Sequence, residues 1–233
     1  MQNYRNSIVI IGSSRNKIAI YEQLLLKRYP RERILYPNIS VMKGKIPSQY
    51  FDYFEPNEDE VFIDAGCLNG KTAVEFTQWA TKGYNYIYSF EANPHAMIDC
   101  EETFKNYGLK GEIINKGLWS EKATLHFNLS LTSDGSKIQS NGEEKIEVVS
   151  LDEVLNGKKA TFIKMDIEGA ELKALLGSEK TIKKWRPRLA ISIYHKLEDI
   201  VEIPALLLEI QPDYKFAIRQ YDSRGSETIL YAY

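Results

Sequence analysis

The chain has 233 residues, of which 43% are hydrophobic and 27% charged, a balance typical of a folded globular protein. Its formal net charge of -2 gives no overall attraction to nucleic acid or to anionic membranes. No apolar run approaches the roughly 20 residues that a membrane-spanning helix needs, and the N-terminus lacks the pattern of a secretory signal. These features favour a cytoplasmic protein without membrane or nucleic-acid partners.

The spacing of the two cysteines is compatible with a cytoplasmic location. Cys67 and Cys100 do not form a CxxC pair or any other metal-ligand spacing. In a reducing cytosol two such residues are expected as buried thiols rather than as a disulfide.

The N-terminal residues 1–47 are predicted to form an extension of one strand and one helix. The strand lies within Ser7–Ser14 and the helix over Lys17–Tyr29, where Ile20, Leu24 and Leu25 recur at helical spacing. The turn between them lacks the second and third glycines of a dinucleotide-binding fingerprint. We therefore place the functional domain at residues 48–233.

From residue 60 onward, short apolar runs alternate with amphipathic runs. Strand followed by helix, repeated, predicts an α/β fold with right-handed crossovers and a parallel sheet. The expected strands are Val61–Gly66, Tyr84–Glu91, Gly111–Asn115, Thr161–Asp166 and Arg188–His195. The expected helices are Lys71–Ala80, His95–Gly108, a helix through Leu172, Leu175 and Leu176 that ends at Gly177, Ser178–Trp185, and Ile203–Ile210 with Pro204 in its first turn.

Two segments depart from this alternation. Ala123–Ser130 and Lys145–Leu151 read as an extra β-hairpin, and the polar, glycine-bearing segment Thr132–Glu144 between them reads as a mobile loop. At the C-terminus, Lys215–Tyr221 and Glu227–Tyr233 are predicted to pair as an antiparallel hairpin.

Polar side chains collect where the expected parallel strands end. Ligands of open parallel sheets bind outside the carboxyl ends of the strands, where the strand order reverses. Surface loops are polar in any case, so this placement is only a moderate indication of a site. The residues at the strand ends are Asp64, Glu91, Asn115, Asp166 and His195.

The stretch VFIDAGCLNG, residues 61–70, sharpens that expectation. Gly66 permits a tight turn and Gly70 opens the next helix, but the spacing is not the GxGxxG that pyrophosphate binding needs. Asp64 would repel a pyrophosphate, whereas Glu91 at the end of the second strand is placed to accept hydrogen bonds from ribose hydroxyls. Together these residues favour S-adenosylmethionine over NAD. The alternative is a purely structural turn with a capping acid.

With these motifs the sequence resembles the class I methyltransferases, and among them the FkbM-type family. The segments that carry the resemblance are DAGCLNG, SFEANP, SLDEVL, FIKMDIEGAELKALLG, RLAISIYHKLEDIVEIP and ETILYA, within residues 48–233. It implies a Rossmann-like, seven-stranded, mostly parallel sheet with a reversed last hairpin. It also implies methyl transfer from S-adenosylmethionine to oxygen, often on a sugar or natural product. By this resemblance, the cofactor is bound by Asp64, Gly66, Gly70, Glu91, Asn93 and Asn115.

The KMDIEGAE block carries the candidate catalytic carboxylates. Glu171 is expected to complement a helix dipole. Asp166 and Glu168 are expected nearer the transferred methyl group, where either could orient or deprotonate a hydroxyl or hold a divalent ion. A metal needs several oxygen ligands, and only these two are identified, so we expect no metal.

His195 is the candidate general base, because its predicted place faces the cofactor crevice and its pKa suits proton transfer. A histidine at a strand end is otherwise structural. The expected acceptor is a small molecule or saccharide, and a homodimer is left open. Two alternatives remain. One is a nucleic-acid methyltransferase, for which the basic run Lys180–Arg188 is the feature, and the other is an inactive protein that keeps the fold for binding.

Overall fold

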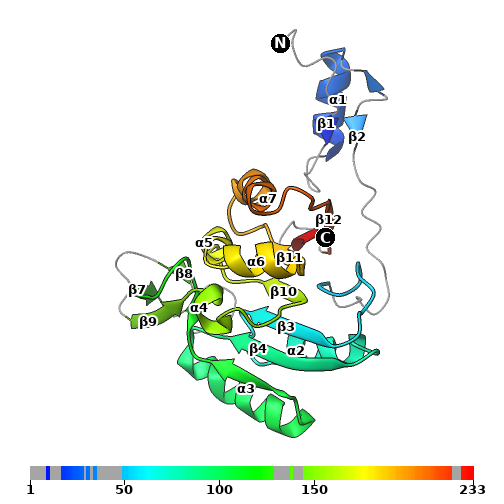
Figure 1. Cartoon of the computed structure of the whole chain (residues 1–233). Helices are drawn as coiled ribbons and strands as arrows, with labels where there is room; N and C mark the ends of the chain where they lie inside the picture. Colours follow the sequence, from blue (N-terminus) through cyan, green and yellow to red (C-terminus); the bar gives the residue numbers. More distant parts are fainter. Residues whose placement is uncertain are drawn as a thin grey trace. The chain divides into compact units, whose positions relative to one another are not determined.

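The computed structural model describes residues 9–10, 17–28, 30–31, 34–35, 49–128, 137–138, 144–221 and 227–233 (Figure 1). The chain divides into a small unit, residues 1–46 with 220–228, and a large unit, residues 47–219 with 229–233. Among the described residues, no helix is both long and apolar enough to cross a membrane.

The small unit contains the strand and helix expected near the N-terminus. Its elements are β1 (Val9–Ile10), α1 (Lys17–Leu26) and β2 (Ile34–Leu35), and β1 pairs with β2 in parallel. The helix α1 ends at Leu26, before the expected Tyr29, and Arg28 already has a positive φ. The remainder of the expected Ser7–Ser14 segment lies outside the described residues.

The large unit is built on a seven-stranded sheet in the order β12-β13-β11-β10-β3-β4-β5. The pairings among β11, β10, β3, β4 and β5 are parallel, and β13 runs antiparallel to β11. This confirms the expected mostly parallel sheet with a reversed C-terminal hairpin. The strands are β3 (Glu60–Ala65), β4 (Tyr84–Phe90), β5 (Gly111–Ile114), β10 (Phe162–Met165), β11 (Arg188–Ser192), β12 (Phe216–Gln220) and β13 (Thr228–Ala232).

Helices connect these strands, and several start or stop at residues that local chemistry favours. The Asn93 side chain caps one helix by accepting from His95 N, and Gly108 ends it in the left-handed conformation. The helices are α2 (Lys71–Trp79), α3 (Pro94–Tyr107), α4 (Leu151–Leu155), α5 (Glu171–Leu176), α6 (Glu179–Trp185) and α7 (Asp199–Ile210).

The two faces of the sheet bury different residues. On one face, aliphatic side chains such as Ile63 and Met165 pack in a core with residues of α4, α5, α6 and α7. On the other face, the Phe62 ring stacks on Phe76 of α2 with centroids 4.4 Å apart, and Phe51 packs against Phe162 at 5.4 Å. Because both faces are covered, β3 and β10 are wholly apolar except for Glu60, Asp64 and Lys164.

The segment that interrupts the alternation of strands and helices forms a second sheet of four strands, in the order β6-β9-β7-β8. The expected hairpin is β7 (Ala123–Asn128) paired antiparallel with β9 (Glu144–Val149), flanked by β6 (Gly117–Leu118) and β8 (Lys137–Ile138). The loop prediction for Thr132–Glu144 is therefore wrong at Lys137, Ile138 and Glu144, which lie in strands, and its other residues lie outside the described part. The strand predicted to reach Leu151 ends at Val149, because the Ser150 hydroxyl accepts from Glu153 N and starts α4.

Two expectations near the site need correction, and the expected helix end at Gly177 is confirmed. The helix α7 begins at Asp199, four residues before Ile203, so Pro204 lies inside it rather than in its first turn. The strand β11 ends at Ser192, which leaves His195 in the loop that follows. Gly177 does follow α5, but with a φ of -77°, and what requires glycine there is packing, because a Cβ would lie 2.0 Å from the Trp119 carbonyl oxygen.

Candidate active site

The order of the central strands places the candidate residues at one edge of the sheet. From β3 the chain proceeds to β4 and β5 on one side, and from β10 to β11 on the other. The reversal of strand order lies between β3 and β10, and ligands of such sheets bind at this point. Candidate residues lie at the carboxyl ends of both strands, with Asp64 on β3, Gly66 directly after β3 and Asp166 directly after β10.

The turn after β3 depends on glycine at two positions. Gly66 has a φ of +78°, and a Cβ there would lie 1.9 Å from the main-chain oxygen of Asp166. Gly70 has a φ of +75° and is the residue before α2, where a Cβ would press on Cys100 and Thr103 at 3.2 Å. The main-chain contact at Gly66 brings the glycine turn directly against the residue that begins the KMDIEGAE loop.

Glu91 holds the glycine turn from the end of β4. Its Oε2 accepts from Leu68 N at 2.9 Å and its Oε1 accepts from Asn93 N at 2.8 Å. Burial raises the pKa of Glu91, and the two backbone N–H groups oppose that rise. Each carboxylate oxygen has one protein donor in this arrangement and retains acceptor capacity for a second.

The two asparagines expected near the cofactor lie beside Glu91. The Asn115 amide donates to the Glu91 carbonyl oxygen at 2.8 Å, and the Asn93 side-chain oxygen accepts from His95 N at 2.9 Å. Both side chains therefore also fix the backbone at the ends of β4 and β5.

Asp64 is fully buried, and its closest charged partner is Lys164 on the neighbouring strand, with Nζ 3.1 Å from Oδ1. Burial raises the pKa of Asp64, and the Lys164 ammonium opposes that rise. Burial likewise disfavours the charge of Lys164, but Asp64 and Asp166 outweigh it and raise the pKa of this ammonium.

Lys164 also joins the two sides of the strand-order reversal. Its Nζ donates to the carbonyl oxygens of Ala65 at 3.1 Å and Gly66 at 2.7 Å, so it fixes the start of the glycine turn. Its positive charge acts on Asp166, and the Tyr50 ring lies 5.2 Å from Nζ. The Tyr50 hydroxyl in turn donates to Asp166 Oδ2 at 2.7 Å.

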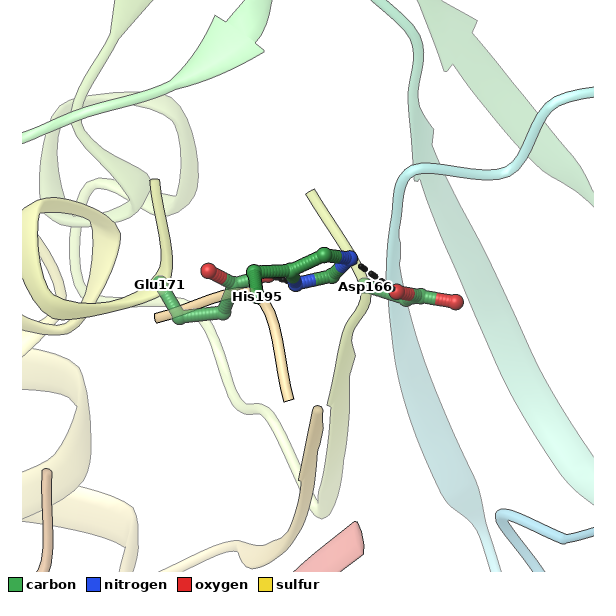
Figure 2. Close-up of side chains that lie close together, drawn as sticks. All are labelled: Asp166, Glu171 and His195. Carbon is green, nitrogen blue, oxygen red and sulfur yellow. Dashed lines mark ion pairs between the residues drawn. The ribbon is translucent and has the colours of Figure 1, made fainter. Parts of the chain in front are cut away.

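Beyond β10, four side chains converge, Asp166, Glu168, Glu171 and His195, and we call them the acid–histidine cluster. His195 Nδ1 lies 2.9 Å from Glu171 Oε1, and its Nε2 lies 3.5 Å from Asp166 Oδ1 and 3.6 Å from Glu168 Oε2. Figure 2 shows the imidazole ring between the Glu171 and Asp166 carboxylates. The cluster therefore surrounds one histidine with three carboxylates.

Local backbone geometry presents these side chains. Glu168 and Gly169 have φ values of +57° and +92°, so the chain turns sharply after β10. Glu168 therefore lies in the turn before α5, which begins at Glu171. Glu171 accepts from Ile167 N at 2.9 Å, which ties the first residue of α5 back to the loop.

The carboxylates set the protonation of the cluster. Burial would lower the pKa of His195, but Glu171, Asp166 and Glu168 outweigh it and raise that pKa. Burial would raise the pKa of Asp166, but Lys164, the Tyr50 hydroxyl and His195 outweigh it and lower that pKa. The Tyr194 hydroxyl also donates to Asp166 Oδ1, at 3.0 Å. In this cluster Asp166 is ionised and His195 holds its proton more firmly than a free histidine.

The structure places the sequence-predicted residues in two groups, one around Glu91 and the glycine turn and one around His195, and it adds partners that sequence reasoning missed. Glu171 was assigned only a helix-dipole role, yet it is the nearest partner of His195. The ion pair of Lys164 with Asp64 was not predicted. Tyr50 precedes the first motif, and no sequence signal marked it.

Four cations of the basic run Lys180–Arg188 have defined contacts within the protein. Lys183 pairs with Glu179, Lys184 donates to Gly157 O at 2.9 Å, Arg186 donates to Asp213 O at 2.8 Å, and Arg188 pairs with the buried Glu60.

Comparison with known proteins agrees with this geometry. Residues 64–221 match the family model described as the methyltransferase FkbM domain. The solved structure of an FkbM methyltransferase from Methylobacillus flagellatus KT aligns with 100% of this chain and 57% of its own length, with a TM-score of 0.69 and 21% identity. The chain thus spans little more than half of that protein.

A precorrin-6y C5,15-methyltransferase from Geobacter metallireducens GS-15 aligns over 87% of this chain and 94% of its own, with a TM-score of 0.53 and 10% identity. At these identities the likeness concerns the fold alone. No curated protein matches the chain.

Proposed function

We propose that the chain, which belongs to the FkbM methyltransferase family, transfers a methyl group from S-adenosylmethionine to a hydroxyl oxygen of a small molecule or saccharide. The observation that carries the proposal is the adjacency of two half-sites. The glycine turn and Glu91 lie on one side of the strand-order reversal and the acid–histidine cluster on the other, and Gly66 touches Asp166 across it.

The residues on the β3–β4 side fit a nucleoside. The carboxylate of Glu91 is fixed beside the glycine turn by Leu68 N, and each of its oxygens retains acceptor capacity for a ribose hydroxyl. A carboxylate at this position suits vicinal hydroxyls and disfavours a phosphate. S-adenosylmethionine, when bound, supplies an electrophilic methyl group on a sulfonium.

Asp64 contributes to this half-site indirectly. It is fully buried, so we assign it to holding Lys164, which fixes the carbonyl groups of Ala65 and Gly66. This refines the expectation that Asp64 lines the cofactor.

The acid–histidine cluster supplies what an acceptor hydroxyl needs. In the transfer, the sulfur–methyl bond breaks to leave S-adenosylhomocysteine, an oxygen–methyl bond forms, and the hydroxyl proton passes to a carboxylate of the cluster. The ionised Asp166 can orient the hydroxyl as a hydrogen-bond acceptor, and Glu168 and His195 lie within 4 Å of one another beside it. In-line displacement depends chiefly on positioning, so we expect large losses when either half-site is displaced.

The test has two parts. Calorimetric titration should show binding of S-adenosylmethionine and S-adenosylhomocysteine but not of NAD, and Glu91→Ala should weaken that binding at least about tenfold, the loss of a charge-assisted contact. Transfer of labelled methyl to a panel of sugars and small-molecule alcohols should fall in His195→Ala while affinity for the cofactor is retained.

Cofactor binding without transfer to any acceptor would instead support a protein that keeps the fold for binding. Salt-dependent binding and methylation of RNA or DNA would support the nucleic-acid alternative. Full activity of His195→Ala would assign that residue a structural role. The cytoplasmic location and a homodimer remain predictions, the first checked by fractionation and the second by sedimentation.

A further inference from the structure

We infer that the acid–histidine cluster binds a divalent cation through His195 Nε2 and the carboxylates of Asp166 and Glu168. Sequence reasoning counted two oxygen ligands and set a metal aside. The structure adds a buried imidazole to them, whose Nε2 lies near both carboxylates. One ligand atom each of Asp166, Glu171 and His195 lies within 4.8 Å of the others, so Glu171 lies beside the proposed ligands.

The distances suit a shared ion. Two ligand atoms that bind one cation at about 2.1 Å lie about 3.0–4.2 Å apart, depending on the angle between them. His195 Nε2 lies 3.5 Å from Asp166 Oδ1 and 3.6 Å from Glu168 Oε2. Both separations exceed those of an aligned hydrogen bond and fall within the range for ligands of one ion.

The imidazole is the second, independent observation. The His195 side chain is only 6% exposed, yet its Nε2 makes no hydrogen bond to the described residues. Glu171 Oε2 is also buried and accepts no hydrogen bond. Buried polar atoms are normally satisfied, and a cation at Nε2 would satisfy the nitrogen that faces Asp166 and Glu168.

Glu171 contacts the ring nitrogen of His195 that does not face the proposed cation. Its Oε1 lies 2.9 Å from His195 Nδ1, and Ile167 N donates to the same oxygen. Metal-bound histidines commonly direct their other ring nitrogen at a carboxylate, which fixes the tautomer and the ring orientation. Glu171 is therefore a positioning residue in this site.

Two carboxylates and one imidazole favour a cation of the Mg²⁺ or Mn²⁺ type, with water or an acceptor oxygen in the open positions. The role of the ion rests on the proposed function. An acceptor hydroxyl bound to the ion would become more acidic, so that its proton could leave near neutral pH. His195 would then act as a ligand through Nε2 of its neutral ring.

The experiment is calorimetric titration of the metal-free full chain with Mn²⁺, without S-adenosylmethionine. We expect one ion per chain, and at least about tenfold weaker binding in Asp166→Asn, His195→Gln and Glu171→Gln. Glu168→Gln, whose side chain is 34% exposed, is the variant least able to disturb the fold and should also weaken binding. Glu209→Gln removes an equal charge from the exposed face of α7 and should bind as the wild type does.

Absence of saturable Mn²⁺ binding, or equal affinity in Glu168→Gln, His195→Gln and the wild type, would overturn the inference. Methyl transfer that persists in excess chelator would reject the role of the ion in acidifying the acceptor hydroxyl while leaving the proposed function intact. The converse result, Mn²⁺ binding that needs the cluster but no methyl transfer, would uphold the metal site and reject the proposed function.

Discussion

The two sides of the strand-order reversal use their polar side chains in opposite ways. Beside the glycine turn, the side chains of Glu91, Asn93 and Asn115 all bond to main-chain groups. In the acid–histidine cluster, side chains face other side chains, and several of their atoms remain without aligned hydrogen bonds. The first pattern holds a loop in shape, and the second holds titratable groups close together at an energetic cost. The residues beside the glycine turn therefore fix backbone conformation, whereas the acid–histidine cluster holds the groups that can exchange protons.

The buried pair Asp64–Lys164 connects the two half-sites, and breaking it should have the largest effect on stability. Asp64→Ala leaves a buried ammonium without its closest countercharge, which costs about 3–5 kcal/mol. Denaturant unfolding monitored by circular dichroism measures the loss. The exposed pair Lys183–Glu179 is the matched control, and Glu179→Gln should cost under about 1 kcal/mol.

A double variant sharpens that measurement. Asp64→Leu combined with Lys164→Met removes both charges, and it should cost less than the sum of the two single changes because no uncompensated charge remains. Additive losses would show that the two residues do not act as a pair.

A single added methyl group should disrupt the glycine turn after β3. Gly66→Ala adds a Cβ that would lie 1.9 Å from the Asp166 carbonyl oxygen, at a φ of +78°. We expect a loss of about 2–4 kcal/mol from overlap and backbone strain together, and loss of S-adenosylmethionine binding by calorimetry.

Gly108→Ala isolates the backbone component. Gly108 has a φ of +59° with nothing within 4 Å of a built Cβ, so this change should cost only about 1 kcal/mol and leave binding unaffected. Equal losses in the two variants would mean that the contact with Asp166 is unimportant.

Local chemistry explains which parts of the fold were predictable. The apolar runs that end at Asp64 and Asp166, and the glycine after α3, are signals contained within a few residues, and the structure confirms the elements they mark. The start of α7 was missed because Pro204 was taken to mark a first turn, whereas the helix accommodates it further in. The strand β8 has only two residues, too short for a periodic pattern.

The site was predictable as a set of positions but not as a set of contacts. Strand ends placed Glu91, Asp166 and His195 at one edge because parallel strands share it. The partners Lys164–Asp64 and Glu171–His195 depend on strand register and on the turn at Glu168, which no local pattern encodes. Because a carboxylate at a helix start is explained by the helix dipole alone, the sequence offered no reason to expect the contact of Glu171 with His195.

The acid–histidine cluster should make the free energy of unfolding depend on pH. We expect this effect to be smaller than those of Asp64→Ala and Gly66→Ala. The pKa of His195 is raised in the folded state because three carboxylates outweigh burial. Its protonated form therefore stabilises the fold fully below the unfolded value of about 6.5, and this contribution is lost as the pH rises through the higher folded value. With chelator present, the free energy of unfolding of the wild type minus that of His195→Gln should be greatest near pH 5.5 and smaller near pH 9. In a Glu171→Gln background the same subtraction should vary less with pH, because the nearest carboxylate is gone; a pH dependence that stays unchanged there would show that Glu171 does not hold the proton on His195.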